Sequence, residues 1–234
     1  MSEQIHLNTI GKTYSMFDKD MKVNQFRSRT IVEHTKGPDV LELGSADGLV
    51  TEELCKKFKN VVAVDASAEL VEKAKVRVPD AIFHVSLFEE FNPEKQYDTI
   101  ILGHVLEHVL DPIAILNIVK KWLKPKGIII ITVPNADSVH RRIGVEMGLL
   151  IYTTQLNDDD IRIGHRRVFN VQTLRTTVIS SGLNILKEEG ILLKPLSNRQ
   201  MFDWTDQLFE AYYSLGKKLP AEFGGELCFI CSQG

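Results

Sequence analysis

Four short apolar runs constrain the fold of this chain more than any other feature. They are "VLEL" (40–43), "VVAV" (61–64), "TIIL" (99–102) and "IIIITV" (128–133). Stretches with the apolar spacing of helices separate them, such as 49–58 and 68–78. Strands rich in Val and Ile that alternate with helices are typical of a parallel sheet covered on both faces. The pattern therefore predicts an α/β fold with right-handed connections between its strands.

Composition excludes several classes of protein. The 28 basic and 31 acidic residues give a formal net charge of −3, which argues against a protein that coats nucleic acid or a membrane surface. No apolar run reaches the length of a membrane span, and "MSEQIHLNTIGK" lacks the layout of a secretory signal. The three cysteines form no disulfide framework, so we expect a cytoplasmic protein. Cys228 and Cys231 are interpreted as small apolar residues on opposite sides of a terminal strand.

A glycine-containing turn follows the first apolar run, in "DVLELGSADG" (39–48). Ligands of open parallel sheets bind beyond the carboxyl ends of the strands, where glycine lets a ligand approach the backbone. The dinucleotide pattern G-x-G-x-x-G is not met, because Ala46 and Leu49 stand at its second and third glycine positions, and no G-K-[ST] follows. Asp65 ends the second run, 21 residues after Gly44, where an acid can accept hydrogen bonds from ribose hydroxyls.

Four ordered segments resemble the motifs of the class I S-adenosylmethionine-dependent methyltransferases. They are "VLELGSADG", "VVAVDAS", "YDTIILGHVLEHVLDP" and "LKPKGIIIITVPN", and the resemblance covers about residues 38 to 135. More narrowly, they resemble the branch that modifies small metabolites, sugars and quinone-like acceptors. The resemblance implies a Rossmann-like sheet of seven strands, six parallel and one antiparallel, with helices on both faces. One departure is Ala46, where the commonest loop of the family has a middle glycine.

The resemblance also implies a cofactor site for S-adenosyl-L-methionine, with S-adenosyl-L-homocysteine as the product and no metal. In the family pattern Gly44 and Glu42 meet the charged methionine end, and Asp65 binds the ribose. Ala66 and the segment 86–88 lie against the adenine, and His104 lies beneath the methionine portion. The residues so assigned are Glu42, Gly44, Ser45, Asp65, Ala66, Ser86, Leu87, Phe88 and His104.

Two histidines are candidate general bases. Methyl transfer is an in-line displacement that depends on positioning, and an oxygen nucleophile usually needs a base as well. Imidazole suits that role near neutral pH. His108 follows the fourth strand in "GHVLEH", and His165 lies in "RIGHRRVF" beyond the fifth strand. Structural roles for both histidines are the alternative, and a carbon acid or an anion needs no base.

An insertion after the fifth strand carries the candidate acceptor-binding residues. It is long for an ordinary connection, and such segments are often lids. Its two ends carry "HRR", and arginine forks suit phosphate or carboxylate. We therefore predict that Arg141, Arg166 and Arg167 bind an anionic acceptor; the alternative is that they pair with Asp158–Asp160 and solvent. Tyr14 is a further substrate-binding candidate or a plain core aromatic.

The sequence thus predicts a methyltransferase that acts on a small-molecule acceptor. O-methylation of an anionic sugar, a phosphoryl compound or a precursor of surface polysaccharides or secondary metabolites is favoured over N- or C-methylation of a quinone-like metabolite. A non-catalytic S-adenosylmethionine-binding or scaffold protein is the alternative from another class. Neither nucleic acid nor a membrane is expected as a partner: the segment 103–106 lacks the Asn/Asp-Pro-Pro-aromatic motif of amino-directed nucleic-acid enzymes. The oligomeric state stays open.

The chain shows no repeats, linkers or low-complexity tracts, so we expect one domain. Its predicted parts are an N-terminal helical segment (1–37), a cofactor-binding core (38–135), a lid and acceptor insertion (136–170) and the C-terminal part of the sheet (171–234).

Overall fold

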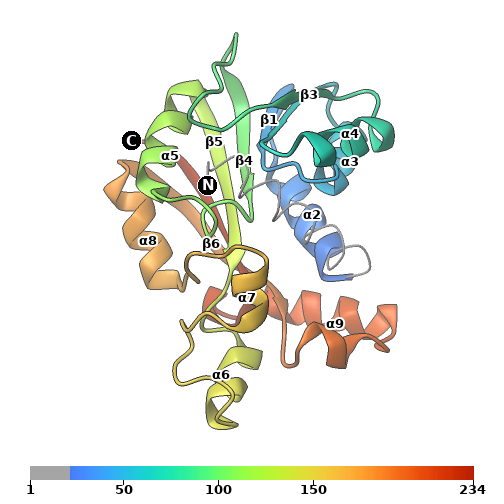
Figure 1. Cartoon of the computed structure of the whole chain (residues 1–234), viewed down its shortest axis with the longest axis vertical. Coiled ribbons are helices and arrows are strands. Elements are labelled where there is room, and N and C mark those ends of the chain that lie inside the picture. The colour runs from blue at the N-terminus through green and yellow to red at the C-terminus, as the bar shows by residue number, and fades with distance from the viewer. Residues whose placement is uncertain (1–21) are drawn as a thin grey trace.

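A computed structural model of the chain describes residues 22–234, which form a seven-stranded sheet with helices on both sides (Figure 1). The predicted residue Tyr14 lies outside the described residues. The strand order is β3-β2-β1-β4-β5-β7-β6, and β7 is antiparallel to both of its neighbours while β1 to β5 pair in parallel. The predicted fold of six parallel strands and one late antiparallel strand is confirmed. The strands are β1 (Asp39–Leu43), β2 (Asn60–Asp65), β3 (Ile82–Val85), β4 (Tyr97–Gly103), β5 (Leu123–Pro134), β6 (Leu183–Leu193) and β7 (Gly224–Gln233).

The helices follow capping signals of the sequence. Asp111 begins one of them by accepting a hydrogen bond at Oδ1 from the backbone N–H of Ala114 at 3.0 Å, with Pro112 in the first turn. Gly182, with φ +73°, ends another. The α-helices are α2 (Lys22–His34), α3 (Leu49–Cys55), α4 (Ala68–Arg77), α5 (Pro112–Val119), α6 (Val139–Glu146), α7 (Asp158–Arg162), α8 (Val171–Ser180) and α9 (Asp206–Gly216). Three 3₁₀ turns complete the set, η1 (Lys120–Trp122), η2 (Asn198–Met201) and η3 (Ala221–Phe223).

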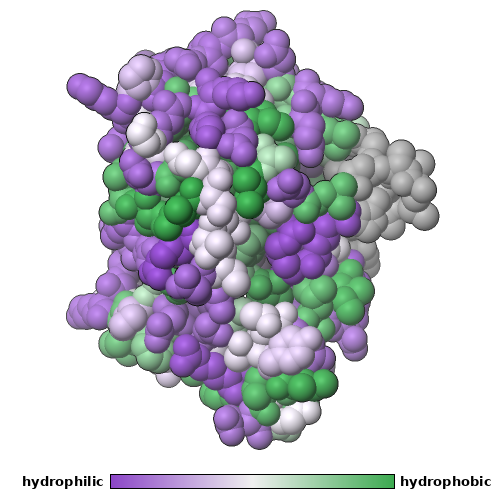
Figure 2. All heavy atoms as spheres, turned by 90° about the vertical axis from the view of Figure 1, so that its left-hand side faces the viewer, coloured by the Kyte–Doolittle hydropathy of each residue, from purple (hydrophilic) through white to green (hydrophobic). Residues whose placement is uncertain are grey.

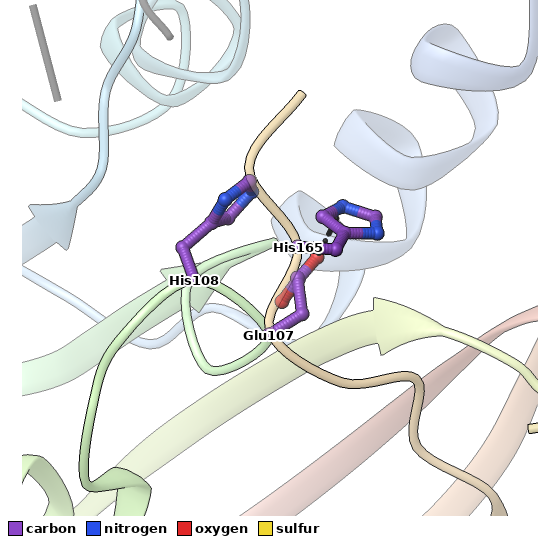
Figure 3. Close-up of side chains that lie close together, drawn as sticks. All are labelled: Glu107, His108 and His165. Atoms are coloured by element: carbon purple, nitrogen blue, oxygen red, sulfur yellow. Dashed lines mark ion pairs between the residues drawn. The ribbon is translucent and has the colours of Figure 1, made fainter. Parts of the chain in front are cut away.

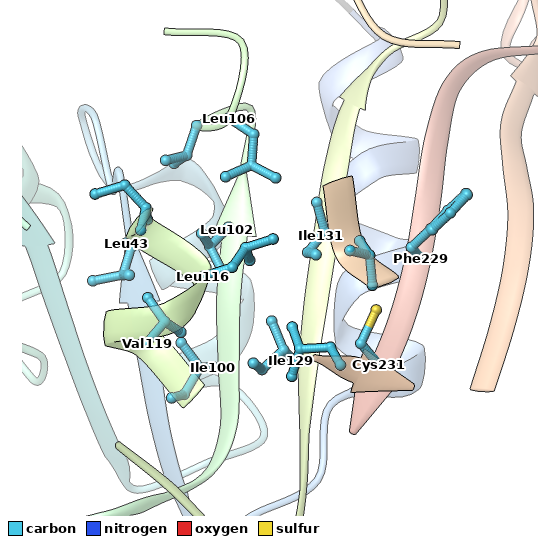
Figure 4. Packing of buried hydrophobic residues seen from close by; sticks show 14 of the residues in the cluster. Leu43, Ile100, Leu102, Leu106, Leu116, Val119, Ile129, Ile131, Phe229 and Cys231 are labelled. Atoms are coloured by element: carbon cyan, nitrogen blue, oxygen red, sulfur yellow. The ribbon is translucent and has the colours of Figure 1, made fainter. Parts of the chain in front are cut away.

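Two apolar clusters bury the two faces of the sheet. On one face, side chains of β1, β4, β5 and β7 pack against α5 and α8, as Figure 4 shows for Leu43, Leu102 and Ile131. On the other face, alternate residues of the same strands pack against α2, α3 and α9. Successive strand residues point to opposite sides, so strands covered on both faces must be apolar throughout. This requirement explains the continuous apolar runs of the sequence.

The two cysteines of β7 fit this alternation. Cys231 belongs to the cluster on the α5 side, whereas Cys228 belongs to the cluster on the α2 side. Burial raises the pKa of the Cys231 thiol to about 12 and that of Cys228 as well. The interpretation of the pair as apolar strand residues is therefore confirmed.

Two connections are shorter than the sequence pattern alone would give. The helix α5 ends at Val119, and the segment "KPKG" (124–127) already belongs to β5. Residues 202–205 separate η2 from α9. Thr205 begins α9, because its hydroxyl accepts a hydrogen bond from the backbone N–H of Leu208 at 3.3 Å.

The insertion after β5, called the lid segment or lid below, contains α6 and α7 and lies beyond the carboxyl end of that strand (Figure 1). The chain leaves and returns side by side, since the backbone N–H of Ala136 donates to the carbonyl of Phe169 at 2.7 Å. Several large apolar side chains of the lid are exposed, among them Met147, Leu149 and Ile151, and Figure 2 shows hydrophobic residues on this lower part of the molecule. Between residues 22 and 234, no helix has the length and apolar character needed to cross a bilayer.

Candidate functional site

The turn after β1 is held on the carboxylate of Asp65. Gly44 adopts φ +78° and donates its N–H to the carbonyl of Val64 at 2.8 Å. Asp65 accepts at Oδ2 from the N–H of Ala46 at 2.9 Å and at Oδ1 from the N–H of Ser67 at 2.8 Å. Burial raises the pKa of Asp65, while these backbone donors act to lower it. The turn after β1 and the turn after β2 therefore both donate to Asp65, a partly exposed acid at the edge of the sheet.

Gly44 is required by both conformation and space. A Cβ at this position would lie 2.7 Å from Cγ2 of Val105, which belongs to the loop after β4, and the positive φ would strain any other residue. The buried hydroxyl of its neighbour Ser45 has no hydrogen-bond partner within 22–234. The turn is thus closely packed at Gly44, with an unpaired polar group beside it.

Glu42 lies beneath this turn as a buried acid of β1. Burial raises its pKa to about 8, although a hydrogen bond from the hydroxyl of Thr51 at 2.5 Å acts in the opposite direction. The nearby charge of Asp65 raises the pKa of Glu42 further. The site therefore holds an acid that a bound cation would ionise.

The segment after β3 lies beside the same acid. The N–H of Ser86 donates to the carbonyl of Asp65 at 3.1 Å, and its hydroxyl donates to the carbonyl of Leu87 at 2.8 Å. Phe88 packs against the apolar cluster on the α5 side and is partly buried, and Ala66 is buried. The structure thus brings together the residues that the resemblance assigns to ribose and adenine.

His104 lies between two buried carboxylates. Its φ of +56° turns the chain sharply after β4. Nε2 lies 3.2 Å from Oε2 of Glu226, and Nδ1 lies 3.5 Å from Oε1 of Glu107. Burial acts to raise the pKa of Glu226, but Arg27, which donates to both of its oxygens at 2.8 Å, and His104 hold that pKa well below its usual range.

Glu107, His108 and His165 converge on one point (Figure 3). Each offers a ligand atom within 4.8 Å of the others, a carboxylate and two imidazoles that also suit a transition metal. Glu107 is fully buried, and neither of its oxygens has a hydrogen-bond partner in the described part of the chain. The rings of His108 and His165 meet edge to face at 4.8 Å between centroids. Burial lowers the pKa of His108 to about 4, so this imidazole is neutral at pH 7.

His165 is oriented by an acid of the lid. Its Nδ1 lies 3.0 Å from Oδ1 of Asp160, whereas its buried Nε2 has no hydrogen-bond partner among residues 22–234 and lies 4.0 Å from Oε1 of Glu107. Burial acts to raise the pKa of Asp160, yet the hydrogen bonds from His165 and from the N–H of Asn157, together with Arg141, lower it to about 2. An ionised Asp160 holds the proton of His165 on Nδ1, which leaves Nε2 as a proton acceptor.

The three predicted acceptor-binding arginines are engaged within the chain. Arg141 is buried, pairs with Asp160 at 3.1 Å and donates to the carbonyl of Thr153 at 2.8 Å and to that of Gln155. Arg166 donates from Nε to the carbonyl of His108 at 2.7 Å. Arg167 binds three carbonyls of the loop after β4, those of Leu106, Val109 and Leu110. The alternative of pairing with Asp158–Asp160 is seen for Arg141 with Asp160, whereas Arg166 and Arg167 bind backbone carbonyls instead.

A cavity of about 280 Å³ lies between the lid and the carboxyl edge of the sheet. Its volume is near the lower end of ordinary ligand pockets. His108 is not among its lining residues, whereas both His104 and His165 are. The lining residues used below are Arg27, His104, Arg141, His165, Lys194 and Glu226.

Sequence reasoning missed Arg27, Lys194 and Glu226. Lys194 follows β6 directly, and β6 runs in the same direction as β1, so the rule that singled out Asp65 applies to it equally. Glu226 comes at the start of β7, and because β7 is antiparallel its start lies at the same edge. No sequence signal links Arg27 to Glu226, which is 199 residues away.

The sheet order, the glycine turn beside an acid and the lid over a polar cavity define a Rossmann-like α/β protein of the methyltransferase class. A family model described as a methyltransferase domain matches residues 17–188. The chain belongs to this family, as its motifs predict.

Curated relatives of the chain have a more specific name than the family model. The ubiquinone biosynthesis O-methyltransferase of Rickettsia bellii is 31% identical over 136 residues, which are 53% of this chain and 56% of that protein. The mitochondrial ubiquinone biosynthesis O-methyltransferase of Homo sapiens is 24% identical over 207 residues, 82% of this chain and 55% of that protein. The chain thus spans about half the length of these relatives.

Solved structures share the fold at low identity. The CcbJ methyltransferase from Streptomyces caelestis has a TM-score of 0.67 and 13% identity, with full coverage of both chains. The N-methyltransferase NodS from Bradyrhizobium japonicum WM9, in complex with S-adenosyl-L-homocysteine, has a TM-score of 0.60 and 14% identity, covering 95% of this chain and 97% of that chain. At these identities the likeness concerns the fold.

Proposed function

We propose that the chain is an S-adenosyl-L-methionine-dependent methyltransferase that O-methylates a small hydroxylated acceptor. The observation that carries this proposal is the pairing of two sites at one sheet edge. One is the glycine turn held on Asp65, and the other is the polar cavity that contains His165. The names of the curated relatives support oxygen as the methylated atom. Anionic sugars, phosphoryl compounds and precursors of polysaccharides or secondary metabolites remain the acceptor classes that the sequence favours.

The residues after β1, β2 and β3 fit the methyl donor. The positive φ of Gly44 and its close approach to Val105 require a residue without a side chain at this turn. The hydroxyl of the neighbouring Ser45 has no hydrogen-bond partner within 22–234. Asp65 is partly exposed and can accept hydrogen bonds from ribose hydroxyls. Glu42 would ionise against the cationic end of the donor. When bound, the sulfonium supplies an electrophilic methyl group and its sulfur leaves as a neutral thioether.

His165 is our candidate for the base of the reaction. As the acceptor oxygen forms its bond to the methyl carbon and the carbon–sulfur bond breaks, the hydroxyl proton passes to Nε2 of His165. Asp160 on Nδ1 and Glu107 near Nε2 would both stabilise the resulting imidazolium. Such a base contributes about 10²–10⁴-fold to the rate. His108, the other base candidate from the sequence, contacts the ring of His165 but is not among the residues that line the cavity.

Two measurements test the proposal. Calorimetric titration with S-adenosyl-L-homocysteine should give binding in wild type and much weaker binding in Asp65→Ala, with Asp80→Ala on the surface as the matched control. Incubation with methyl-labelled S-adenosyl-L-methionine and a panel of hydroxylated small molecules should then give a labelled ether. Absence of binding would refute the donor site. Binding without turnover on any acceptor would favour the non-catalytic alternative, and label on nitrogen or carbon would favour N- or C-methylation.

A further inference from the structure

Among residues 22–234, the lining of the cavity beneath the lid contains one cation whose charge no lining acid neutralises closely. Two acids of the lining are matched by lining arginines. Glu226 pairs with Arg27 at 2.8 Å, and Asp160 pairs with Arg141 at 3.1 Å. Within the described part of the chain, Lys194 is the remaining cation of the lining.

The third acid of the lining does not alter this balance. Asp159 is exposed and lies 3.5 Å from Arg162 on the same helix, α7. Within 22–234, Nζ of Lys194 donates no hydrogen bond, and its neighbours act on it only through their charges. An ammonium on a cavity wall with three unused donors is a site for an anion.

The surroundings of Lys194 support this interpretation. Burial lowers the pKa of its ammonium to about 8, with Glu226 acting to raise that pKa and Arg141 to lower it. The protonated form is therefore still the major one at pH 7. His140 lines the same cavity, and burial lowers its pKa to about 3, so this imidazole is neutral and does not compete as a cation.

The other cations of this region are already occupied. Arg166 and Arg167 bind carbonyls of the loop after β4, and neither is among the lining residues. Arg141 is held by Asp160 and two lid carbonyls. An anionic group that enters the cavity would therefore find its partner at the end of β6 and not on the lid.

We propose that Lys194 binds a compact oxyanion of the acceptor, a carboxylate or a phosphate, and so selects anionic over neutral acceptors. The inference rests on the proposed function, since it concerns the acceptor side of that site. Lys194 acts here in binding and selection, while His165 remains the base. With a cavity of about 280 Å³, the anion belongs to a molecule about the size of one substituted ring.

The test uses the full chain and four small probes. Benzoate and phenyl phosphate carry the two oxyanions, and benzamide and benzyl alcohol are their neutral counterparts. Each is titrated by calorimetry into wild type, Lys194→Met, Lys194→Arg and Lys187→Met, with and without S-adenosyl-L-homocysteine. Lys187 is the matched control, because it lies on the same strand but pairs with Glu189 at 2.6 Å.

Wild type should bind at least one oxyanion at least tenfold more tightly than its neutral counterpart. Lys194→Met should remove that preference, Lys194→Arg should retain part of it, and Lys187→Met should retain all of it. The stronger anion identifies carboxylate or phosphate as the source. Lys194→Gln replaces the Met variant if thermal unfolding shows that the latter is not folded.

Two results would overturn the inference: no preference for either anion in wild type, or an unchanged preference in Lys194→Met. Failure of the proposed function is a separate result, because it appears as absent binding of S-adenosyl-L-homocysteine in the titration without probes. The probe titrations without S-adenosyl-L-homocysteine still decide the role of Lys194 in that case.

Discussion

The turns after β1 and β2 and the cavity beneath the lid lie along the same edge of the sheet, yet they are built differently. The turns use residues 42–67, and Asp65 accepts its hydrogen bonds from the backbone of Ala46 and Ser67 within that stretch. The cavity gathers residues from Arg27 to Glu226 and contains the buried Nε2 of His165, which has no hydrogen-bond partner in the described part of the chain. The first region is suited to one invariant ligand, and the second to a ligand that must supply the missing partners.

Replacing the proposed base, His165, should give the largest loss of activity. The change should not affect ligand binding at the glycine turn. His165→Gln keeps a polar group but removes the proton acceptor, so the turnover number should fall about 10²–10⁴-fold while the affinity for S-adenosyl-L-homocysteine is unchanged. Steady-state kinetics and calorimetry measure the two quantities. His108→Gln, the matched variant one ring away, should lose less than tenfold. A larger loss in His108→Gln would exchange the two roles.

Adding a side chain at Gly44 should weaken ligand binding at the glycine turn and leave the cavity unchanged. Gly44→Ala combines a positive φ with a contact at 2.7 Å, so affinity for S-adenosyl-L-homocysteine should fall about 10- to 100-fold. Gly148→Ala is a matched control in the lid, where φ is +69° but nothing lies within 4 Å of the added Cβ. Equal affinities of the two variants would show that the close approach to Val105 is unimportant.

The loop after β4 joins the two regions. Substituting Arg167, which binds this loop, should show whether the role of that arginine is structural. Arg167→Met removes hydrogen bonds to three carbonyls, so the free energy of unfolding should fall by about 1–3 kcal/mol in denaturant titrations. The Michaelis constant for the acceptor should change less than twofold. Arg162→Met, an exposed change on the same lid, should alter neither quantity. A raised Michaelis constant with unchanged stability would instead support the anion-binding role.

Glu42 should make donor binding depend on pH. Its pKa of about 8 means that the free protein holds a proton there at pH 7, and a cationic ligand must displace it. Affinity for S-adenosyl-L-homocysteine should therefore fall as pH decreases below 8, by about three- to tenfold between pH 8 and pH 6.5 relative to Glu42→Gln. The difference between the two proteins removes the titration of the ligand itself. Parallel pH profiles would show that Glu42 does not meet the charged end.

Metal removal should have the smallest effect. Because His165 accepts a proton at Nε2 in the proposed reaction, an ion on that nitrogen would compete with it. Treatment with a chelator should change the turnover number less than twofold, with methyl transfer measured before and after addition of Zn²⁺ or Mg²⁺. Loss of activity that a metal restores would assign Glu107, His108 and His165 to an ion.

The contrast between the two regions also explains what the sequence predicts well. The fold follows from the apolar strand runs, and the residues predicted after β1, β2 and β3 lie together, because each follows directly from a strand end. The cavity depends on pairs such as Arg27 with Glu226 and Arg141 with Asp160, which form only when distant segments pack. Arginines at both ends of the lid suggested an anion site, yet the structure places them on backbone carbonyls. Side-chain type alone cannot distinguish these two uses.

The bonds from Arg166 and Arg167 to the loop after β4 have a mechanical consequence. The segment that returns from the lid is fastened to the same short loop that carries Glu107 and packs Val105 against Gly44. Any movement of that segment relative to the sheet must either break those bonds or move the loop with it. A displacement there would therefore change the contact between Val105 and the glycine turn.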